Sequence, residues 1–587
     1  MPQGRRKTPF SGKAKKEQLK AKKQFKQGPN HNPNRNPFLL EGERDLGEGS
    51  GNVEKINFQP TRDGRSKPNR YALQFYRETQ EEIVKQKEIA RQSLEVKEEQ
   101  DLEIEGSHFF NTDFDFPKRP PWEFGLSKEK LDQQENHYFT EYVRNIEEKY
   151  DWKDLSLFEL NLETWRQLWR VLEMSDIVLF IVDIRFAAVM FPPSLYTYVT
   201  KTLKKDFILV INKIDLAPPS LVVAWKAYFK ERYPNLQIVL FTTLPGYNLI
   251  GNQGNENGLQ VRRRRGRIRM AAEGAQQIFD VCKKLVTGEV DLSSWHTKIK
   301  EECCVENSDS DEDDEAVKID EKVNLKCVDT DYFQYEKYNK GVLTIGCIGQ
   351  PNVGKSSIMN ALMGKKVVSV SKTPGHTKHF QTIFLTPTVR LCDCPGLVFP
   401  SKVPKPLQVL MGSFPIAQLR QPFTTVKYIA ERLNLVSLLR IDHPTNDDTW
   451  SAMDICDGWA KKRGYYTAKA ARLDSYRAAN SLLRMALDGK ICLCLRPPGY
   501  CQQKHVWENH PDIKLVQSIQ AKNADSASYS EFNVAISDTD DDEIPKLRKK
   551  PETKKSTDEE YEDEDESSED DDVELTSNKF AALGTNV

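Results

Sequence analysis

The stretch from Gly349 to Ser356 constrains this chain more than any other feature, and it reads Gly-Gln-Pro-Asn-Val-Gly-Lys-Ser. A glycine, four free positions and Gly-Lys-Ser form the pattern of a phosphate-binding loop. The apolar run 342–348 before it predicts a buried strand, and residues 357–363 after it predict a helix. This context suits the motif, because backbone N–H groups of the loop and the N-terminus of the following helix attract phosphate together.

Each position of this loop is a candidate for nucleotide binding. Lys355 is expected to reach the β- and γ-phosphates, and the Ser356 hydroxyl is expected to ligate Mg²⁺. Ser357, the next residue, belongs to the same candidate site. The candidates are Gly349, Gln350, Pro351, Asn352, Val353, Gly354, Lys355, Ser356 and Ser357.

A second motif follows the apolar strand predicted at 207–211 and reads Asn-Lys-Ile-Asp. A carboxylate accepts hydrogen bonds only, so Asp215 can pair with the N1–H and the exocyclic amine of guanine. Adenine offers no N1–H donor. The motif therefore predicts guanine selection by Asp215, with Lys213 covering the base and Asn212 bracing the loops. An ATPase would need Asp215 to play no part.

Two further elements follow the phosphate loop. Thr377, in a Thr-Pro-Gly-His-Thr segment, could close on Mg²⁺ and the γ-phosphate, as switch loops do. Two short strands then lead to Asp393-Cys394-Pro395-Gly396, where Asp393 would serve Mg²⁺ and the Gly396 N–H would meet the γ-phosphate. We therefore expect Thr377 and Gly396 at the reacting phosphate, and Ser356, Thr377 and Asp393 around Mg²⁺.

The order of these motifs is unusual, because the guanine element at 212–215 precedes the phosphate loop at 349–356. A circular permutation explains it, since surface termini that lie close can be joined and the chain reopened elsewhere without moving the site. The new connection would be the polar, charged stretch from about 245 to 335. The fold class expected is α/β, a P-loop GTPase fold in permuted order, with a helical C-terminal domain and disordered charged tails.

On these motifs the chain resembles the circularly permuted GTPases related to bacterial YlqF and to eukaryotic ribosome-assembly GTPases. The resemblance implies GTP or GDP as ligand, Mg²⁺ as cofactor, and ribosomal RNA or a pre-ribosomal particle as partner. It rests on residues 212–215, 349–356, 374–377, 393–396, the basic N-terminal arm and the segment 468–500.

The same resemblance assigns further residues. Thr242 and Thr243 stand in the guanine loop, where the family usually has Ser-Ala. Leu397 replaces the water-positioning Gln of Ras-type enzymes, which implies slow intrinsic hydrolysis. Asn352 stands where related GTPases use an Asn to help bind K⁺, so a potassium ion is an expected cofactor.

The net charge of −2 hides a strong segregation of basic and acidic residues. The basic arm is a nuclear or nucleolar address, an RNA-contacting tail or a solvated charge run. The acidic tail masks that arm, binds basic ribosomal proteins or only solubilises the chain.

The expected division is a disordered basic arm at 1–70, a helical or extended segment at 71–155, the permuted G domain at 156–420 with its flexible insertion at about 245–335, a helical domain at 421–505 and a disordered acidic tail at 506–587.

Basic and aromatic residues mix in the helical C-terminal domain, which suits RNA contact or an ordinary helical domain with a charged exterior.

The longest apolar run, 177–182, is too short to cross a bilayer, and no signal peptide is visible. We expect a monomeric intracellular protein, nuclear or nucleolar, with shuttling to the cytoplasm. The rival to a GTP-hydrolysing switch is a scaffold that senses GTP without hydrolysing it.

Overall fold

In the described part of the chain, six strands form one mixed sheet in the order β5-β4-β3-β6-β8-β7. Only β7 runs antiparallel to its neighbour. The strand that leads into the phosphate loop, β6, therefore lies between β3 and β8. The strands are β3 (Ile177–Asp183), β4 (Asp206–Asn212), β5 (Gln237–Leu240), β6 (Leu343–Gly349), β7 (Gln381–Thr386) and β8 (Val389–Asp393).

The computed structural model describes residues 55–56, 75–76, 79–110, 115–123, 126–150, 155–243, 272–305, 336–364, 367–368, 381–467 and 472–520. Several predictions fall outside these ranges. They concern the basic arm before residue 55, most of the insertion, the switch residue Thr377 and the acidic tail after residue 520. In the part described, no helix is long and apolar enough to cross a membrane.

The pairing of β3 with β6 joins the two halves of the permuted order. Ile177 pairs with Ile345 and Ile181 with Gly349, in parallel register. Every residue of both strands is buried. Such continuous apolar strands are typical of a parallel sheet covered on both faces. The carboxyl ends of β3, β4, β5, β6 and β8 consequently meet at one edge, where open α/β sheets bind ligands.

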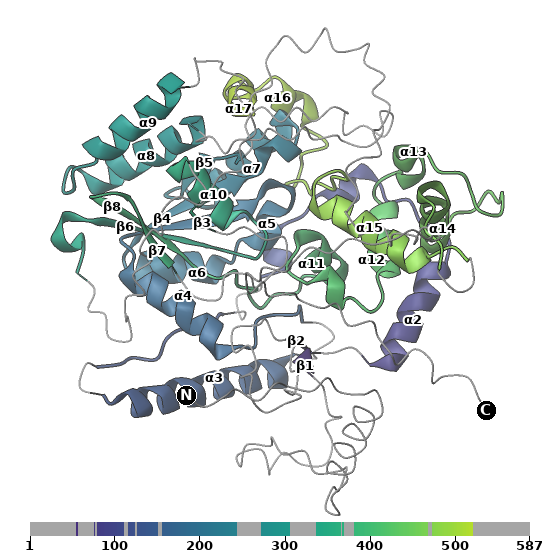
Figure 1. Cartoon of the computed structure of the whole chain (residues 1–587), viewed down its shortest axis with the longest axis horizontal. Helices are drawn as coiled ribbons and strands as arrows, with labels where there is room; N and C mark the ends of the chain where they lie inside the picture. The colour runs from purple at the N-terminus through teal and green to yellow at the C-terminus, as the bar shows by residue number, and fades with distance from the viewer. Residues whose placement is uncertain are drawn as a thin grey trace, which may run out of the picture. The chain divides into compact units, whose positions relative to one another are not determined.

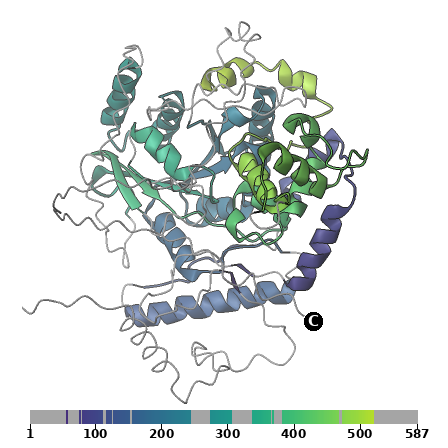
Figure 2. The same cartoon turned by 45° about the vertical axis from the view of Figure 1, so that its right-hand side comes forward.

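Helices cover this sheet on both faces, as Figures 1 and 2 show. Gly346 explains how closely one of them approaches, because a Cβ there would lie 2.3 Å from Ser175 Oγ at the end of α4. The helices of this part are α4 (Leu162–Met174), α5 (Ala187–Met190), α6 (Pro193–Thr197), α7 (Pro219–Arg232), α8 (Ala272–Val286), α9 (Ser293–Val305) and α10 (Lys355–Met363).

The region expected to be helical after the sheet is divided into short helices by turn residues. Gly412 and Gly464 cap two of them in the left-handed conformation, with φ of 75° and 67°. Pro415 and Pro422 precede the next turns. The elements are α11 (Lys405–Met411), α12 (Phe423–Ala430), α13 (Leu435–Leu439), α14 (Ala452–Arg463) and α15 (Ser475–Leu487).

The structure differs from the expected domain boundary at residue 505. Two more helices follow, α16 (Lys504–Glu508) and α17 (Ile513–Ile519), and both lie against α7 (Figure 1). The indole N–H of Trp225 in α7 donates to the Leu495 carbonyl at 3.0 Å, and Gln520 donates to the Ile214 carbonyl at 2.6 Å. This return of the chain was not predicted, because the charged composition after residue 520 led to an expected tail over the whole of 506–587.

The N-terminal part contains a two-residue ladder of β1 (Lys55–Ile56) with β2 (Phe75–Tyr76), then α2 (Gln80–Arg91) and α3 (Lys128–Lys149). Ser127 caps α3, since its Oγ accepts from Lys130 N at 3.4 Å. Between these helices, the segment 115–123 lies against α3 and α4.

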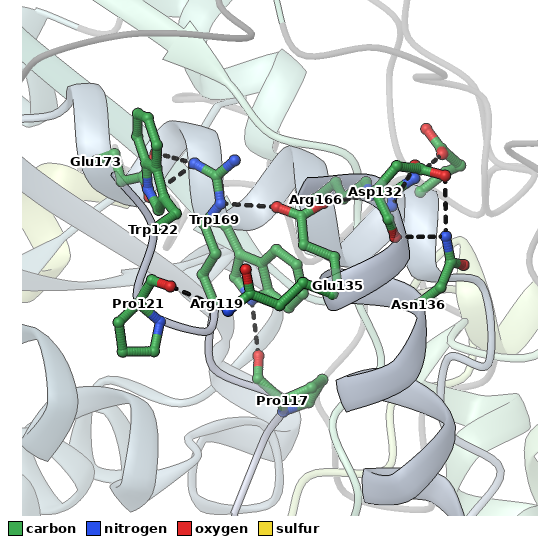
Figure 3. Close-up of polar contacts among 12 residues, drawn as sticks. Pro117, Arg119, Pro121, Trp122, Asp132, Glu135, Asn136, Arg166, Trp169 and Glu173 are labelled. Atoms are coloured by element: carbon green, nitrogen blue, oxygen red, sulfur yellow. Dashed lines mark hydrogen bonds and ion pairs between the residues drawn. The ribbon is translucent and has the colours of Figure 1, made fainter. Parts of the chain in front are cut away.

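Buried ion pairs hold this segment in place (Figure 3). Arg119 binds Glu135 of α3 at 2.9 Å and Glu173 of α4 at 2.7 Å. Arg166 of α4 binds Glu135 from the other side at 2.8 Å. The indole N–H of Trp169 donates to the Pro117 carbonyl at 2.7 Å.

Candidate functional site

The guanine element and the phosphate loop touch each other at the carboxyl edge of the sheet. The Asn212 amide donates to the Val353 carbonyl at 2.7 Å. The Lys213 ammonium donates to the Asn352 carbonyl at 2.7 Å. These residues lie 141 and 139 positions apart in the chain, so the fold assembles what the permuted order separates.

Asp215, the residue expected to select guanine, is buried and oriented by a partner. The Thr242 hydroxyl donates to Asp215 Oδ1 at 2.9 Å. Thr242 therefore acts through its side chain, a role that its place in the guanine loop did not indicate. Thr243 is half-buried beside it.

Lys213 stands in the left-handed conformation with φ of 58°, which turns its side chain toward the neighbouring strand end. There its ammonium binds Asp183 at 2.9 Å. The Arg185 guanidinium binds the same carboxylate at 2.8 Å and also donates to the Ala486 carbonyl of α15 at 2.7 Å. Burial alone would raise the pKa of Asp183, but the two cations outweigh it and hold that pKa below its ordinary value.

The phosphate loop needs its glycines because neighbours approach closely. At Gly354, where φ is 99°, an added Cβ would lie 2.4 Å from the amide nitrogen of Asn212. At Gly349 it would lie 2.5 Å from the Ile181 carbonyl oxygen. The guanine element and β3 thus fix the shape of the loop from two sides.

Lys355 begins α10 and is buried under the loop. Its ammonium donates to the carbonyls of Gly349 at 3.1 Å and Gln350 at 2.8 Å. Burial lowers the pKa of Lys355, while the nearby Asp393 carboxylate acts in the opposite direction. Carbonyl oxygens therefore hold the Lys355 ammonium inside the loop, where a phosphate oxygen would be a further hydrogen-bond acceptor.

Two of the residues expected around Mg²⁺ contact each other. Ser356 Oγ donates to Asp393 Oδ2 at 3.0 Å. The other oxygen of Asp393 is buried and has no hydrogen-bond partner within the described ranges. Burial raises the pKa of Asp393 to about 6, against the opposing charge of Lys355. A hydroxyl and an unsatisfied carboxylate oxygen fit a hard divalent cation. Thr377, the third expected residue, is not among those described.

Gly396 lies against the loop so tightly that a Cβ would meet the Pro351 Cα at 2.8 Å. The following residue, Leu397, is fully buried and its N–H donates to the Gly349 carbonyl at 3.3 Å. Ser357 is half-buried in the first turn of α10. The segment from Asp393 onward is therefore part of the same site.

The loop also contacts the segment after α11. The Asn352 side chain donates through Nδ2 to the Gly412 carbonyl at 2.9 Å. The Ser413 hydroxyl donates to Gln350 Oε1 at 2.8 Å. Sequence reasoning missed Gly412 and Ser413, and nothing in the local sequence marks them.

Asp183 and Arg185 were also missed, although a signal for them exists. They follow directly on the apolar strand β3, and charged residues at the carboxyl end of a buried parallel strand lie where ligands bind.

Comparisons with known proteins show which proteins this chain is similar to. A family model described as "50S ribosome-binding GTPase" matches residues 344–449. Guanine nucleotide-binding protein-like 1 of Homo sapiens is 46% identical over 545 residues, which cover 88% of this chain and 90% of the relative. Large subunit GTPase 1 of Saccharomyces cerevisiae is 33% identical over 413 residues, 66% of this chain and 58% of the relative.

Among solved structures, GNP-bound YlqF from T. maritima aligns with a TM-score of 0.31 and 17% identity, over 57% of this chain and 97% of that one. The identity of 46% over most of both chains assigns the family. This protein is therefore a guanine-nucleotide-binding GTPase, and it belongs to the family of guanine nucleotide-binding protein-like 1, whose motifs stand in circularly permuted order.

Proposed function

We propose that this GTPase is a slow, Mg²⁺-dependent switch that potassium stimulates and that acts in assembly of the large ribosomal subunit. The observation that carries the slow rate is Leu397, which is fully buried where a water-positioning side chain is expected. A buried leucine offers no group that could orient the attacking water. The yeast relative's name, Large subunit GTPase 1, supports the ribosomal role.

The residues of the phosphate site have separate tasks in this proposal. Lys355 and the loop N–H groups bind the β- and γ-phosphates, while Ser356 and Asp393 hold Mg²⁺, which supplies charge stabilisation on the phosphates. Asn352 Oδ1 would bind K⁺ beside them, because the Gly412 carbonyl already engages its amide nitrogen. The positive charge of K⁺ would stand where other GTPases use an arginine finger.

Single-turnover GTP hydrolysis in equal concentrations of KCl and NaCl tests the chemistry. We expect at least about a tenfold faster rate in KCl, and an Asn352→Ala variant that has lost the difference. Asn509→Ala is the control. It changes an exposed residue at the end of α16 and should keep the difference in rate between KCl and NaCl. Tight GTP binding without turnover in either salt would instead support the non-hydrolysing scaffold.

The helical region offers a candidate face for RNA. Arg463 lies over the Trp459 ring at 4.8 Å, and Arg477 lies over Tyr465 at 4.4 Å. Tyr466 is 52% exposed beside them. The guanidinium groups suit contact with phosphates, and the exposed Tyr466 ring suits stacking with an unpaired base. We propose that this face binds ribosomal RNA, which fits a nuclear or nucleolar location.

Binding of ribosomal RNA fragments over a series of salt concentrations tests this face. Lys461, in the last turn of α14, and Arg472, next to the Leu473 that pairs with Tyr466, are exposed cations near this face. Lys461→Ala/Arg472→Ala should weaken binding and lower the salt slope by about 2. Lys130→Ala/Arg144→Ala on α3 removes the same charge elsewhere and should change neither. If the two double variants lost RNA affinity equally, binding would depend on overall charge alone, and the proposed face would be contradicted.

A further inference from the structure

The phosphate loop rests on a turn from the helical region, and this turn makes side-chain contacts with two of its residues. Gly412 caps α11 with φ of 75°, and Ser413 follows it. Helix α11 itself packs against α12 and α15. The turn therefore belongs to the helical region, although it lies directly beneath the nucleotide site.

The contact of Ser413 with Gln350 is fully enclosed. Ser413 is 1% exposed and Gln350 is 3% exposed, and the hydroxyl donates to Gln350 Oε1 at 2.8 Å. The backbone carbonyl of the same Gln350 accepts from the Lys355 ammonium at 2.8 Å. The side chain that Ser413 holds thus belongs to the residue whose main chain positions the phosphate-binding lysine.

Gly412 adds a second contact at Asn352. Its carbonyl accepts from the Asn352 amide at 2.9 Å, and a Cβ on Gly412 would lie 2.8 Å from that amide nitrogen. Asn352 in turn accepts the Lys213 ammonium on its own carbonyl at 2.7 Å. The loop is therefore held between the guanine element on one side and the Gly412–Ser413 turn on the other.

We propose that Ser413 is a positioning residue for GTP binding, which acts through Gln350 to fix the phosphate loop in the shape that Lys355 needs. Without the hydroxyl, Gln350 Oε1 is buried without its donor, and the loop relaxes to satisfy it. The proposal goes beyond the ribosomal switch, because it concerns nucleotide affinity and requires neither potassium nor RNA.

The same contact has a consequence for the helical region. Because binding and conformation are linked, a nucleotide that fixes the loop must also steady the turn that supports it. Bound nucleotide should therefore slow amide hydrogen exchange at Gly412 and Ser413, and α11 should be the first helix of the helical region to respond.

The test compares full-length wild type with Ser413→Ala and a matched control. Ser401→Ala removes another buried serine hydroxyl, which contacts Ser156 at 3.0 Å and not the loop. Fluorescence titration with a labelled GDP measures affinity. We expect Ser413→Ala to weaken it about tenfold, with kcat at saturating GTP within about twofold, and Ser401→Ala to retain wild-type affinity.

A double-mutant cycle identifies the route of the effect. In a Gln350→Leu background, Ser413→Ala should add less than about twofold, since its partner is already gone. Ser413→Cys keeps a hydrogen-bond donor at this position, although a weaker and larger one, and its affinity should lie between those of wild type and Ser413→Ala. Wild-type affinity and exchange at the turn in a well-folded Ser413→Ala, or fully additive effects with Gln350→Leu, would overturn the proposal.

Discussion

Lys213 and Asp183 form an ion pair of 2.9 Å across the ends of two neighbouring strands. Asp183 ends β3, and its register partner in β4 is Asn212, the residue before Lys213. Arg185 binds the same carboxylate and reaches the helical region through the Ala486 carbonyl. The lysine expected to cover guanine is therefore fixed by a buried carboxylate that two cations share.

Replacing this carboxylate should loosen the guanine element. Asp183→Asn removes one charge and leaves Arg185 buried without its counter-ion, so we expect a loss of about 3 kcal/mol in unfolding free energy. We also expect about tenfold weaker GDP binding, because Lys213 loses its anchor. Glu99→Gln is the control, since Glu99 pairs with Arg496 from an exposed position. Unchanged GDP affinity in Asp183→Asn would show that the pair serves the fold alone.

Alanine variants of two glycines in the left-handed conformation, Gly354 and Gly464, distinguish the cost of backbone strain from an effect on nucleotide binding. Gly354→Ala places a Cβ against Asn212, whereas Gly464→Ala at φ of 67° meets open space. Both should lose about 1 kcal/mol or more of stability, because both hold an alanine in the left-handed region. Only Gly354→Ala should abolish nucleotide binding. Titration of both variants with GDP checks this, and a Gly354→Ala protein that binds normally would contradict the packing described.

Much of the sheet could be predicted from the sequence because its strands are continuous apolar runs. The apolar run 177–182 lies within β3 (Ile177–Asp183), and the predicted strand at 207–211 lies within β4 (Asp206–Asn212). The motifs that follow these strands also indicated the site, since the carboxyl ends of parallel strands lie at one edge of the sheet. At these positions the apolar sequence pattern matches the burial of the strands in the fold.

The contacts that depend on tertiary packing could not be predicted in the same way. Ser413 reaches Gln350 across 63 positions, and no periodicity marks it. Likewise, Tyr500 bonds Ser220 across 280 positions, so the return of the chain to α7 is a property of the fold rather than of local composition. The helical region was expected, but Gly412 and Gly464 divide it into shorter helices.

Asp393 should reduce the stability of the nucleotide-free protein. Burial raises the pKa of its folded carboxyl to about 6, above the ordinary value of 3.8. The folded state then binds more protons between these values, so stability falls as pH rises through about 4 to 6. Asp393→Asn avoids this loss and should be more stable than wild type by roughly 2–3 kcal/mol at pH 7 without nucleotide.

The same variant should lose the stabilisation that Mg²⁺ and GTP give together. Thermal unfolding at pH 4 and pH 7, with and without Mg²⁺·GTP, measures both effects. Lower stability of nucleotide-free Asp393→Asn at pH 7 would contradict the assignment of a destabilising buried carboxylate.

A buried and an exposed arginine distinguish the ion pairs of the N-terminal part. Arg119 is 9% exposed between Glu135 and Glu173, whereas Arg144 pairs with Glu148 at 3.6 Å with 64% of its side chain exposed. Arg119→Ala should cost about 3 kcal/mol, because it removes a buried cation that Glu135 and Glu173 share, although Glu135 keeps its ion pair with Arg166. Arg144→Ala should change stability by less than about 0.5 kcal/mol. Denaturant unfolding checks both, and equal losses would contradict a stabilising role for the Arg119 ion pairs drawn in Figure 3.

The most direct measurement is the affinity for GTP, ATP and xanthosine triphosphate of wild type and Asp215→Asn. Wild type should prefer GTP strongly, because the Asp215 carboxylate, held by Thr242, accepts from the base. The side-chain amide of asparagine donates instead. The variant should therefore lose affinity for GTP and gain affinity for xanthosine triphosphate, whose C2 position carries a carbonyl. Equal GTP affinity in wild type and Asp215→Asn would contradict a guanine site at this edge of the sheet.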